Sequence, residues 1–179
     1  MLHHKILSIV MLILFSFVLI GFGADKPQYV GASKCKACHN SSKKGAQFKK
    51  WESTKHASAY TDLKSDNAKK KAEAMGVKDP LTDQKCLSCH STAGGAKNVE
   101  ASYKVDEGVG CEACHGPGSL YRKNSVMKDQ KAAVAVGMLI PDEKTCKNCH
   151  KPDTKGHENK FKDFKTEYPK IAHEMPKEK

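Results

Sequence analysis

The sequence is poor in the large apolar side chains that usually build a protein core. Beyond Gly23, 18 of the remaining 156 residues are Leu, Ile, Val or Phe, which is about 12%. A basic chain with so few of these residues is normally disordered. An ordinary aliphatic core is therefore excluded, and a stable fold needs another source of apolar surface.

Arginine is almost absent as well. Of the 31 basic residues, Arg122 is the single arginine and the others are lysines. Nucleic-acid sites depend on arginine forks and stacked aromatic rings, so we expect no nucleic-acid partner. A lysine-rich surface favours transient docking of redox proteins, acidic ones in particular, although the same lysines would also serve simply to keep a small basic protein soluble.

The one long apolar run lies at the N-terminus, over residues 6–22. It follows a short positive segment and ends in small residues, which is typical of a Sec signal peptide over residues 1–23. Its 17 residues would also fit a retained membrane anchor, and we expect contact with a membrane only in that case. Either way, we expect residues 24–179 to form a single domain that is exported to the periplasm or the cell exterior.

No cysteine stands outside a repeated motif. The chain has four copies of Cys-x-x-Cys-His, at residues 35–39, 86–90, 111–115 and 146–150, which we call the first to fourth motifs. This spacing lets two thiols add to the vinyl groups of one haem, while the adjacent histidine binds its iron as the proximal ligand. Disulfides or zinc knuckles would leave the four histidines unexplained. The sequence therefore predicts four haem c groups, tethered by Cys35, Cys38, Cys86, Cys89, Cys111, Cys114, Cys146 and Cys149 and bound at iron by His39, His90, His115 and His150.

Four haems would also supply the missing apolar surface. There would be one macrocycle for about every 39 residues, each with two broad apolar faces to bury. We therefore expect a mainly α-helical, haem-cored multihaem cytochrome c fold, with short helices, long loops and little β structure. The chain without haem is expected to be largely unfolded.

The first spacer carries a helical pattern. Phe48, Trp51, Tyr60 and Leu63 share one face of a helical wheel, and His56 falls on the same face. Further helices are expected over 69–75 and 130–139, on a short turn at each motif, and from near Pro169 onward to carry His173, with a loop or short hairpin over 91–110.

The remaining histidines limit the axial ligands. Apart from the two in the N-terminal segment and the four in the motifs, three remain, His56, His157 and His173, so four irons share at most three distal histidines. Either one iron takes another ligand, for which the Met138 thioether is the foremost candidate, or one iron is open on its distal side. An iron with two histidines is closed and suits electron transfer, whereas an open iron binds small molecules.

Two stretches within residues 29–118 resemble the tetrahaem cytochrome c-554 family. The first joins the first motif to Trp51-x-x-Thr54-Lys55-His56-Ala57, and the second is the run Gly-Val-Gly-Cys-Glu-Ala-Cys-His-Gly-Pro-Gly at 108–118. The resemblance implies a helical fold around four closely packed haems. Three irons would have two histidines each, and the iron of the second motif would be five-coordinate.

Carried over by position, the resemblance also implies partners for the distal histidines. His56 would bind the iron of the third motif, and His173 that of the first. The family's third distal histidine precedes the fourth motif, where this chain has none. His157 therefore takes its place at the fourth motif, or Met138 does, or a second iron is open.

These features together predict a periplasmic tetrahaem cytochrome that carries electrons between redox partners through closely packed haems. We assign no catalytic residue. Two alternatives remain open. One is a redox enzyme acting on nitric oxide, nitrite, hydroxylamine or peroxide at an open haem on the second motif. The other is a membrane-anchored quinol dehydrogenase subunit, if residues 6–22 are retained.

Overall fold

The computed structural model describes residues 25–152, 154, 157–158 and 161–175, and the predicted signal segment lies outside them. Within this part of the chain the regular structure is helical, and the β pairing is limited to an isolated parallel bridge between Tyr29 and Val99. The prediction of a mainly α-helical fold with little β structure is confirmed. No helix among the described residues is long and apolar enough to cross a membrane.

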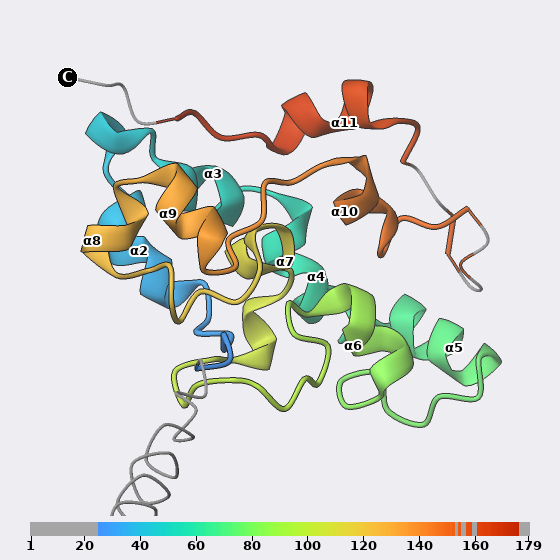
Figure 1. Ribbon diagram of the computed structural model, residues 1–179. Coiled ribbons are helices and arrows are strands. Elements are labelled where there is room, and N and C mark those ends of the chain that lie inside the picture. Colours follow the sequence, from blue (N-terminus) through green and yellow to red (C-terminus); the bar gives the residue numbers. More distant parts are fainter. Residues whose placement is uncertain (1–24, 153, 155–156, 159–160, 176–179) are drawn as a thin grey trace, which may run out of the picture.

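Among the residues that the structure describes the helices are short, and the longest of them, α5, has nine residues. In chain order they are α2 (Ser33–His39), η2 (Ser42–Lys44), α3 (Gln47–Glu52), α4 (Lys55–Asp62), α5 (Asp66–Ala74), α6 (Gln84–His90), η3 (Val105–Glu107), α7 (Cys111–His115), α8 (Asn124–Met127), α9 (Gln130–Ala135), α10 (Glu143–Lys147) and α11 (Phe164–Ile171). Figure 1 shows them joined by long loops rather than packed as a bundle.

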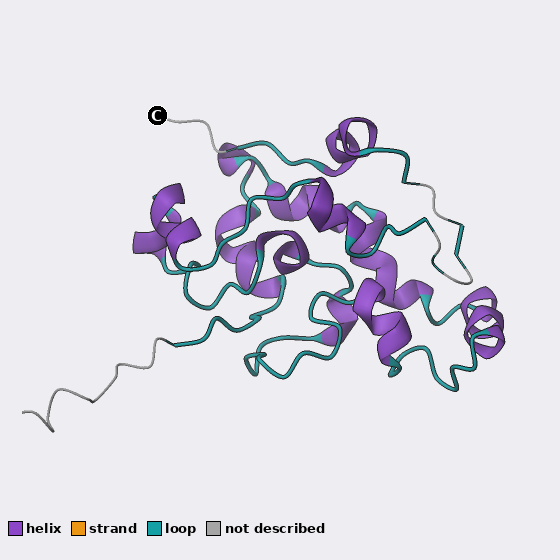
Figure 2. Ribbon diagram, turned by 45° about the vertical axis from the view of Figure 1, so that its right-hand side comes forward, coloured by secondary structure: helices purple, strands orange, loops and turns teal. Residues whose placement is uncertain are grey.

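The molecule has two ends with α4 and α7 between them. Helices α5 and α6 lie at one end, and α2, α8 and α9 at the other (Figures 1 and 2). The C-terminal segment with α11 runs along one side, back toward α3. Segments far apart in the sequence, such as the first motif on α2 and residues 172–175, are thus brought to the same end.

Buried apolar side chains are few, as the composition predicts. One cluster lies where α4, α5 and α6 meet, and it contains Leu63, Ala72, Val77, Cys86 and Leu87. The other buried apolar residues that the structure describes are scattered: Val30, Ala32, Phe48, Tyr121 and Ala133. The helices around the first, third and fourth motifs therefore have little aliphatic material to pack on.

The helix predicted in the first spacer is present, but it is divided in two. Helix α3 ends at Glu52, and Thr54 is extended (φ −97°, ψ 161°) before α4 begins. Phe48 and Trp51 lie on α3, whereas His56 lies on α4. The helix expected over 69–75 begins earlier, because the Ser65 side chain caps it and accepts from the Ala68 N–H at 3.2 Å.

One further element prediction needs correction, and for another the structure decides between the two alternatives, in favour of the loop. The helix expected over 130–139 ends at Ala135, because Gly137 adopts a positive φ of 106°. Residues 91–110 form a loop containing η3, without a hairpin.

The last helix does not begin near Pro169. Asp163 caps it, accepting from the Thr166 N–H at 2.8 Å, so α11 begins at Phe164 and includes the proline. It ends at Ile171, and His173 lies two residues beyond it. The prediction that this helix carries His173 was therefore wrong.

Candidate functional site

The four motifs are close neighbours in space. The Cys35 thiol of the first motif lies close enough to Cys111 of the third for the two to shift each other's pKa. The Cys149 thiol of the fourth motif interacts in the same way with Cys89 of the second, and its sulfur lies 3.8 Å from the carbonyl oxygen of Ser88, next to Cys89. The third and fourth motifs are near enough for the charges of Cys114 and Cys146 to interact. The motifs are therefore neighbours in the order first, third, fourth, second.

None of the eight cysteines, all of which lie in the part of the chain that the structure describes, is joined in a disulfide. The contact with Cys149 lowers the pKa of Cys89 to about 5, whereas the contact with Cys111 raises the pKa of Cys35. Burial, together with nearby Cys146, raises the pKa of Cys114 to about 11. The structure therefore gives no support to the alternative that the cysteines form disulfides.

Each of the three spare histidines faces a motif histidine. The separations of the ring centres are 6.1 Å for His56 and His150, 5.8 Å for His157 and His90, and 5.9 Å for His173 and His115. The angles between ring planes are 62°, 53° and 40° in the same order.

These separations fit a metal ion between the rings. A metal–imidazole bond is about 2.0 Å long, so two imidazoles bound from opposite sides have ring centres about 6 Å apart. Rings on a shared axis rotate freely about it, and the three different angles are therefore compatible with this arrangement. Among the described residues no three His, Cys, Asp or Glu side chains gather as a metal cluster, and each pair thus offers two donors. This donor set fits haem, whose macrocycle supplies the other four nitrogens.

Hydrogen bonds fix the orientation of three motif histidines. The Nδ1 atom of His90 donates to the Ala59 carbonyl at 2.7 Å, and that of His115 to the Leu139 carbonyl at 3.2 Å. His39 donates in the same way to the Gln47 side-chain oxygen at 3.3 Å. A proton held on Nδ1 leaves the Nε2 lone pair free to bind a metal ion.

Burial keeps two of the imidazoles in the neutral form that metal binding needs. It lowers the pKa of His56, and nearby His150 adds to the shift. Burial likewise lowers the pKa of His115, although the hydrogen bond to Leu139 partly opposes this. A neutral ring binds a metal ion without first losing a proton.

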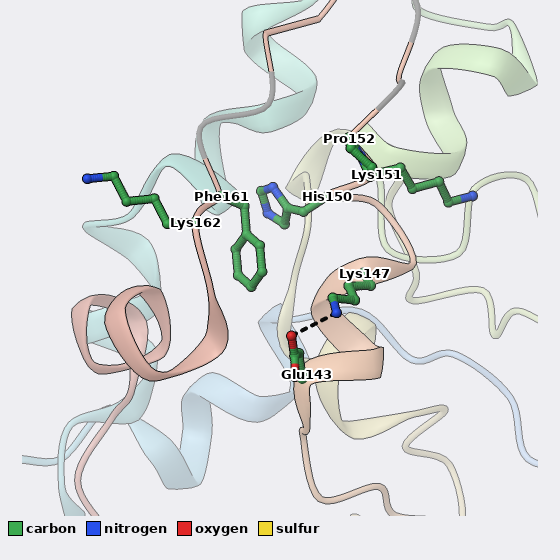
Figure 3. A pocket seen from close by; sticks show the side chains of 7 residues that line it. All are labelled: Glu143, Lys147, His150, Lys151, Pro152, Phe161 and Lys162. Carbon is green, nitrogen blue, oxygen red and sulfur yellow. Dashed lines mark ion pairs between the residues drawn. The ribbon is translucent and has the colours of Figure 1, made fainter.

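A cavity of about 420 Å³ lies beside His150. The Phe161 ring stacks on His150 with 5.2 Å between ring centres, and Lys147 pairs with Glu143 at 2.8 Å (Figure 3). The cavity thus combines apolar faces with positive charge, which suits a planar apolar group that carries carboxylates. Its complete lining is Glu143, Lys147, His150, Lys151, Pro152, Phe161 and Lys162.

The two family-like stretches are joined to each other directly. The Trp51 indole N–H donates to the Val109 carbonyl at 2.8 Å, and the Val109 N–H donates to the His56 carbonyl at 2.9 Å. Gly108 has a φ of +70°, and a Cβ there would lie 2.7 Å from the His56 carbonyl oxygen. This glycine lets the segment before the third motif lie directly against the start of α4.

A buried carboxylate holds the third motif in place. Glu112 is 2% exposed and accepts from the N–H groups of Val30 at 2.9 Å, Gly31 at 2.8 Å and Gly118 at 2.6 Å. Burial raises its pKa, while these N–H groups partly oppose the shift. Glu112 and Gln47 are site residues that sequence reasoning missed. Gln47 has no sequence signature, and the signal for Glu112 was its place in the family-like run at 108–118.

The histidine pairs differ from those that the family resemblance implies. His56 lies against the fourth motif rather than the third, and His173 against the third rather than the first. His157 faces the second motif rather than the fourth. Met138 lies next to the third motif, because the carbonyl of the following residue, Leu139, accepts the hydrogen bond from His115.

Comparison with known proteins gives a consistent match. A sequence profile of the family described as "Cytochrome c554 and c-prime" matches residues 34–116. Cytochrome c-554 of Nitrosomonas europaea is 33% identical over 144 residues, an alignment that covers 71% of this chain and 59% of that protein. The chain thus spans less than two thirds of the relative's length. The solved structure of the reduced state of cytochrome c554 from Nitrosomonas europaea superimposes with a TM-score of 0.54 at 25% identity, covering 83% of this chain and 80% of that one.

Proposed function

Because the chain belongs to the cytochrome c-554 family, we propose that it is a tetrahaem c-type cytochrome that carries electrons between redox proteins outside the cytoplasm. The main support is the combination of four complete motifs with three pairs of facing histidines. When bound, haem c supplies a one-electron iron couple. The polypeptide supplies everything else that a carrier needs.

The first task of the chain is to hold the ligands in place. The cysteine pair of each motif would tether one haem, and the motif histidine would bind its iron. His56, His157 and His173 would be the distal ligands at the fourth, second and third motifs. The Nδ1 hydrogen bonds of His39, His90 and His115 orient these rings, which would strengthen the binding of iron and tune its reduction potential.

The second task is to place the motifs in a continuous row. The interactions between cysteines make the first motif a neighbour of the third, the third a neighbour of the fourth, and the fourth a neighbour of the second. The first and second motifs, on α2 and α6, lie toward opposite ends of the molecule (Figure 1). This arrangement suits a carrier whose donor and acceptor dock at different places.

Lysines near the first motif favour a docking partner with an acidic surface. Lys36 is exposed on α2, as is Cys38 of the first motif, and Lys43 and Lys44 are exposed on η2, which follows α2 in the chain. Such a surface would speed encounter with an acidic redox protein at low salt without tight binding. The rate of electron exchange should therefore fall as ionic strength rises.

The test is a redox titration of the purified exported protein, preceded by a pyridine haemochrome assay. We expect four haems per chain and the reversible uptake of four electrons. The control is the double variant Cys146→Ala/Cys149→Ala, which should take up three. A chain with fewer haems, or one that takes up no electrons reversibly, would contradict the proposal. The mass of the mature protein separates a soluble carrier from the anchored alternative.

A further inference from the structure

We propose that the open iron of this chain is the one held by the first motif, through Cys35, Cys38 and His39, and that it binds small ligands such as nitric oxide or cyanide. This inference rests on the proposed function, because it needs a haem at each motif. It differs from the family pattern, in which the iron of the second motif is the open one.

The first argument is that every spare histidine is already paired with another motif. His173 has its ring centre 5.9 Å from that of His115, and His157 has its ring centre 5.8 Å from that of His90. The third, His56, faces His150 at 6.1 Å. One imidazole nitrogen binds one iron, so these three pairs leave the first motif without a distal histidine among the described residues.

The second argument is that the proximal ligand of the first motif, His39, is held in a fixed orientation. Gln47 is 7% exposed, and its side-chain oxygen accepts from His39 Nδ1 at 3.3 Å. The Gln47 amide nitrogen donates to the Glu174 carbonyl at 3.1 Å and also to the Lys44 carbonyl. Three hydrogen bonds therefore fix Gln47, which in turn fixes the plane of the His39 ring. Gln47 is a positioning residue for this iron.

The third argument is exposure to solvent. Helix α2, which carries the first motif, has no buried residue. Cys38 is exposed, whereas the other seven cysteines are buried or partly buried. A small ligand therefore has direct access to this end of the molecule. An iron with one histidine and an open position accepts neutral or anionic donors of this kind.

Gln47→Glu locates the open iron without removing a ligand. Glutamate is a stronger acceptor for the His39 Nδ1 proton, so it strengthens the iron–histidine bond of the first motif. Its second oxygen replaces the amide group that donates to the Glu174 and Lys44 carbonyls, so the variant should also be less stable, and its haem content is checked before the spectrum is recorded. In the reduced protein, the iron–histidine stretch in the resonance Raman spectrum arises from five-coordinate haem. We expect this band to shift to higher frequency in Gln47→Glu. An unchanged band would place the open iron at another motif and overturn the proposal.

The matched control is Gln84→Glu, which adds the same charge at an exposed position two residues before Cys86 of the second motif. We expect the band to stay unchanged in this variant. A shift in Gln84→Glu but not in Gln47→Glu would point to the second motif and contradict the proposal.

A second measurement does not depend on the buried Gln47 site. Electron paramagnetic resonance of the oxidised wild-type protein should show one high-spin haem in four, and imidazole should convert it to low spin with a stoichiometry of one per chain. In His157→Leu, the number of high-spin haems and the number of imidazoles bound per chain should both rise to two, since this variant opens the iron of the second motif. An all-low-spin wild-type spectrum, or an unchanged count in His157→Leu, would overturn the assignment. The haem count is measured first, so a chain with fewer than four haems refutes the proposed function instead.

Discussion

Glu112 stabilises the third motif through hydrogen bonds to the backbone, although we assign it no role in binding haem. Both of its oxygens accept backbone N–H groups, from residues 30–31 and from Gly118. In Glu112→Gln, an NH2 group replaces one acceptor and faces a backbone donor. We expect the free energy of unfolding of the holoprotein to fall by about 2 kcal/mol. Denaturant unfolding followed by haem absorbance measures this.

Glu73→Gln is the control, because Glu73 is exposed on α5. It should change the unfolding free energy by less than about 0.5 kcal/mol. Equal midpoints for the two variants would show that the Glu112 carboxylate does not stabilise the third motif.

The sequence predicts the site residues that must stand at a fixed spacing for their chemistry. The cysteines and histidines of the motifs stand out because covalent haem needs that spacing. The distal histidines were found by counting. Their pairing could not be found, because it depends on how α4 and the C-terminal segment cross the motifs. Gln47 was missed for the same reason, since its contacts with His39 and Glu174 exist only in the folded chain.

At the scale of elements, the junction between α4 and the third motif depends on Gly108. Its φ of +70° and ψ of −148° lie in a region that glycine alone adopts without strain, and a Cβ would lie within 2.8 Å of two backbone oxygens. We expect Gly108→Ala to lower the unfolding free energy by at least about 2 kcal/mol. It should also disturb the low-spin signal that depends on His56, because α4 must move away.

Gly76→Ala is the matched comparison for this prediction. Gly76 has a similar φ of +67°, but a Cβ there would have no atom within 4 Å. This variant carries the strain of a positive φ without the clash, at a cost of about 1 kcal/mol. If both variants lose the same stability, close packing at Gly108 is not the cause.

Helix α11 depends on a titratable cap. Hydrogen bonds from Thr166 lower the pKa of Asp163 below its ordinary value of 3.8. A lowered pKa means that the folded chain favours the ionised form, so the cap contributes fully above pH 3.8 and is lost as the pH falls through the lower folded pKa. We expect the helix that precedes His173 to loosen in that acidic range.

Hydrogen exchange of the α11 amides as a function of pH measures this effect. Asp163→Asn keeps an oxygen that caps the helix but does not titrate, so protection in this variant should not fall at low pH through loss of the cap. Identical acid profiles for wild type and variant would contradict the role of Asp163. Pro169 favours a helix start, so the sequence predicts the start of this helix too late. The Asp-x-x-Thr cap at Asp163 begins it earlier and outweighs the one backbone hydrogen bond that Pro169, which has no N–H, cannot make.

At the scale of the whole molecule, the shortage of apolar side chains governs folding. The buried apolar residues form one cluster around α4, α5 and α6 and are otherwise scattered. The first, third and fourth motifs therefore lack a core of their own. The fold class could be predicted because the composition excluded an aliphatic core and the motifs indicated that haem takes its place. The arrangement of the helices could not, since haem contacts and chain crossings decide it.

The chain without haem should consequently be largely unfolded. Expression in a strain that lacks haem attachment, followed by far-ultraviolet circular dichroism, measures this. We expect the helical signal of the apo-chain to be far below that of the holoprotein. An apo-chain with the full helical signal would show that the polypeptide builds its core unaided.

The most direct test of the whole account is the mass and thiol content of the mature exported protein. If haem provides the interior, every cysteine is used for attachment, so the mass should exceed that of the polypeptide by four haems and a thiol assay should find none. A colourless protein with eight free thiols, or with cystines in their place, would contradict the account.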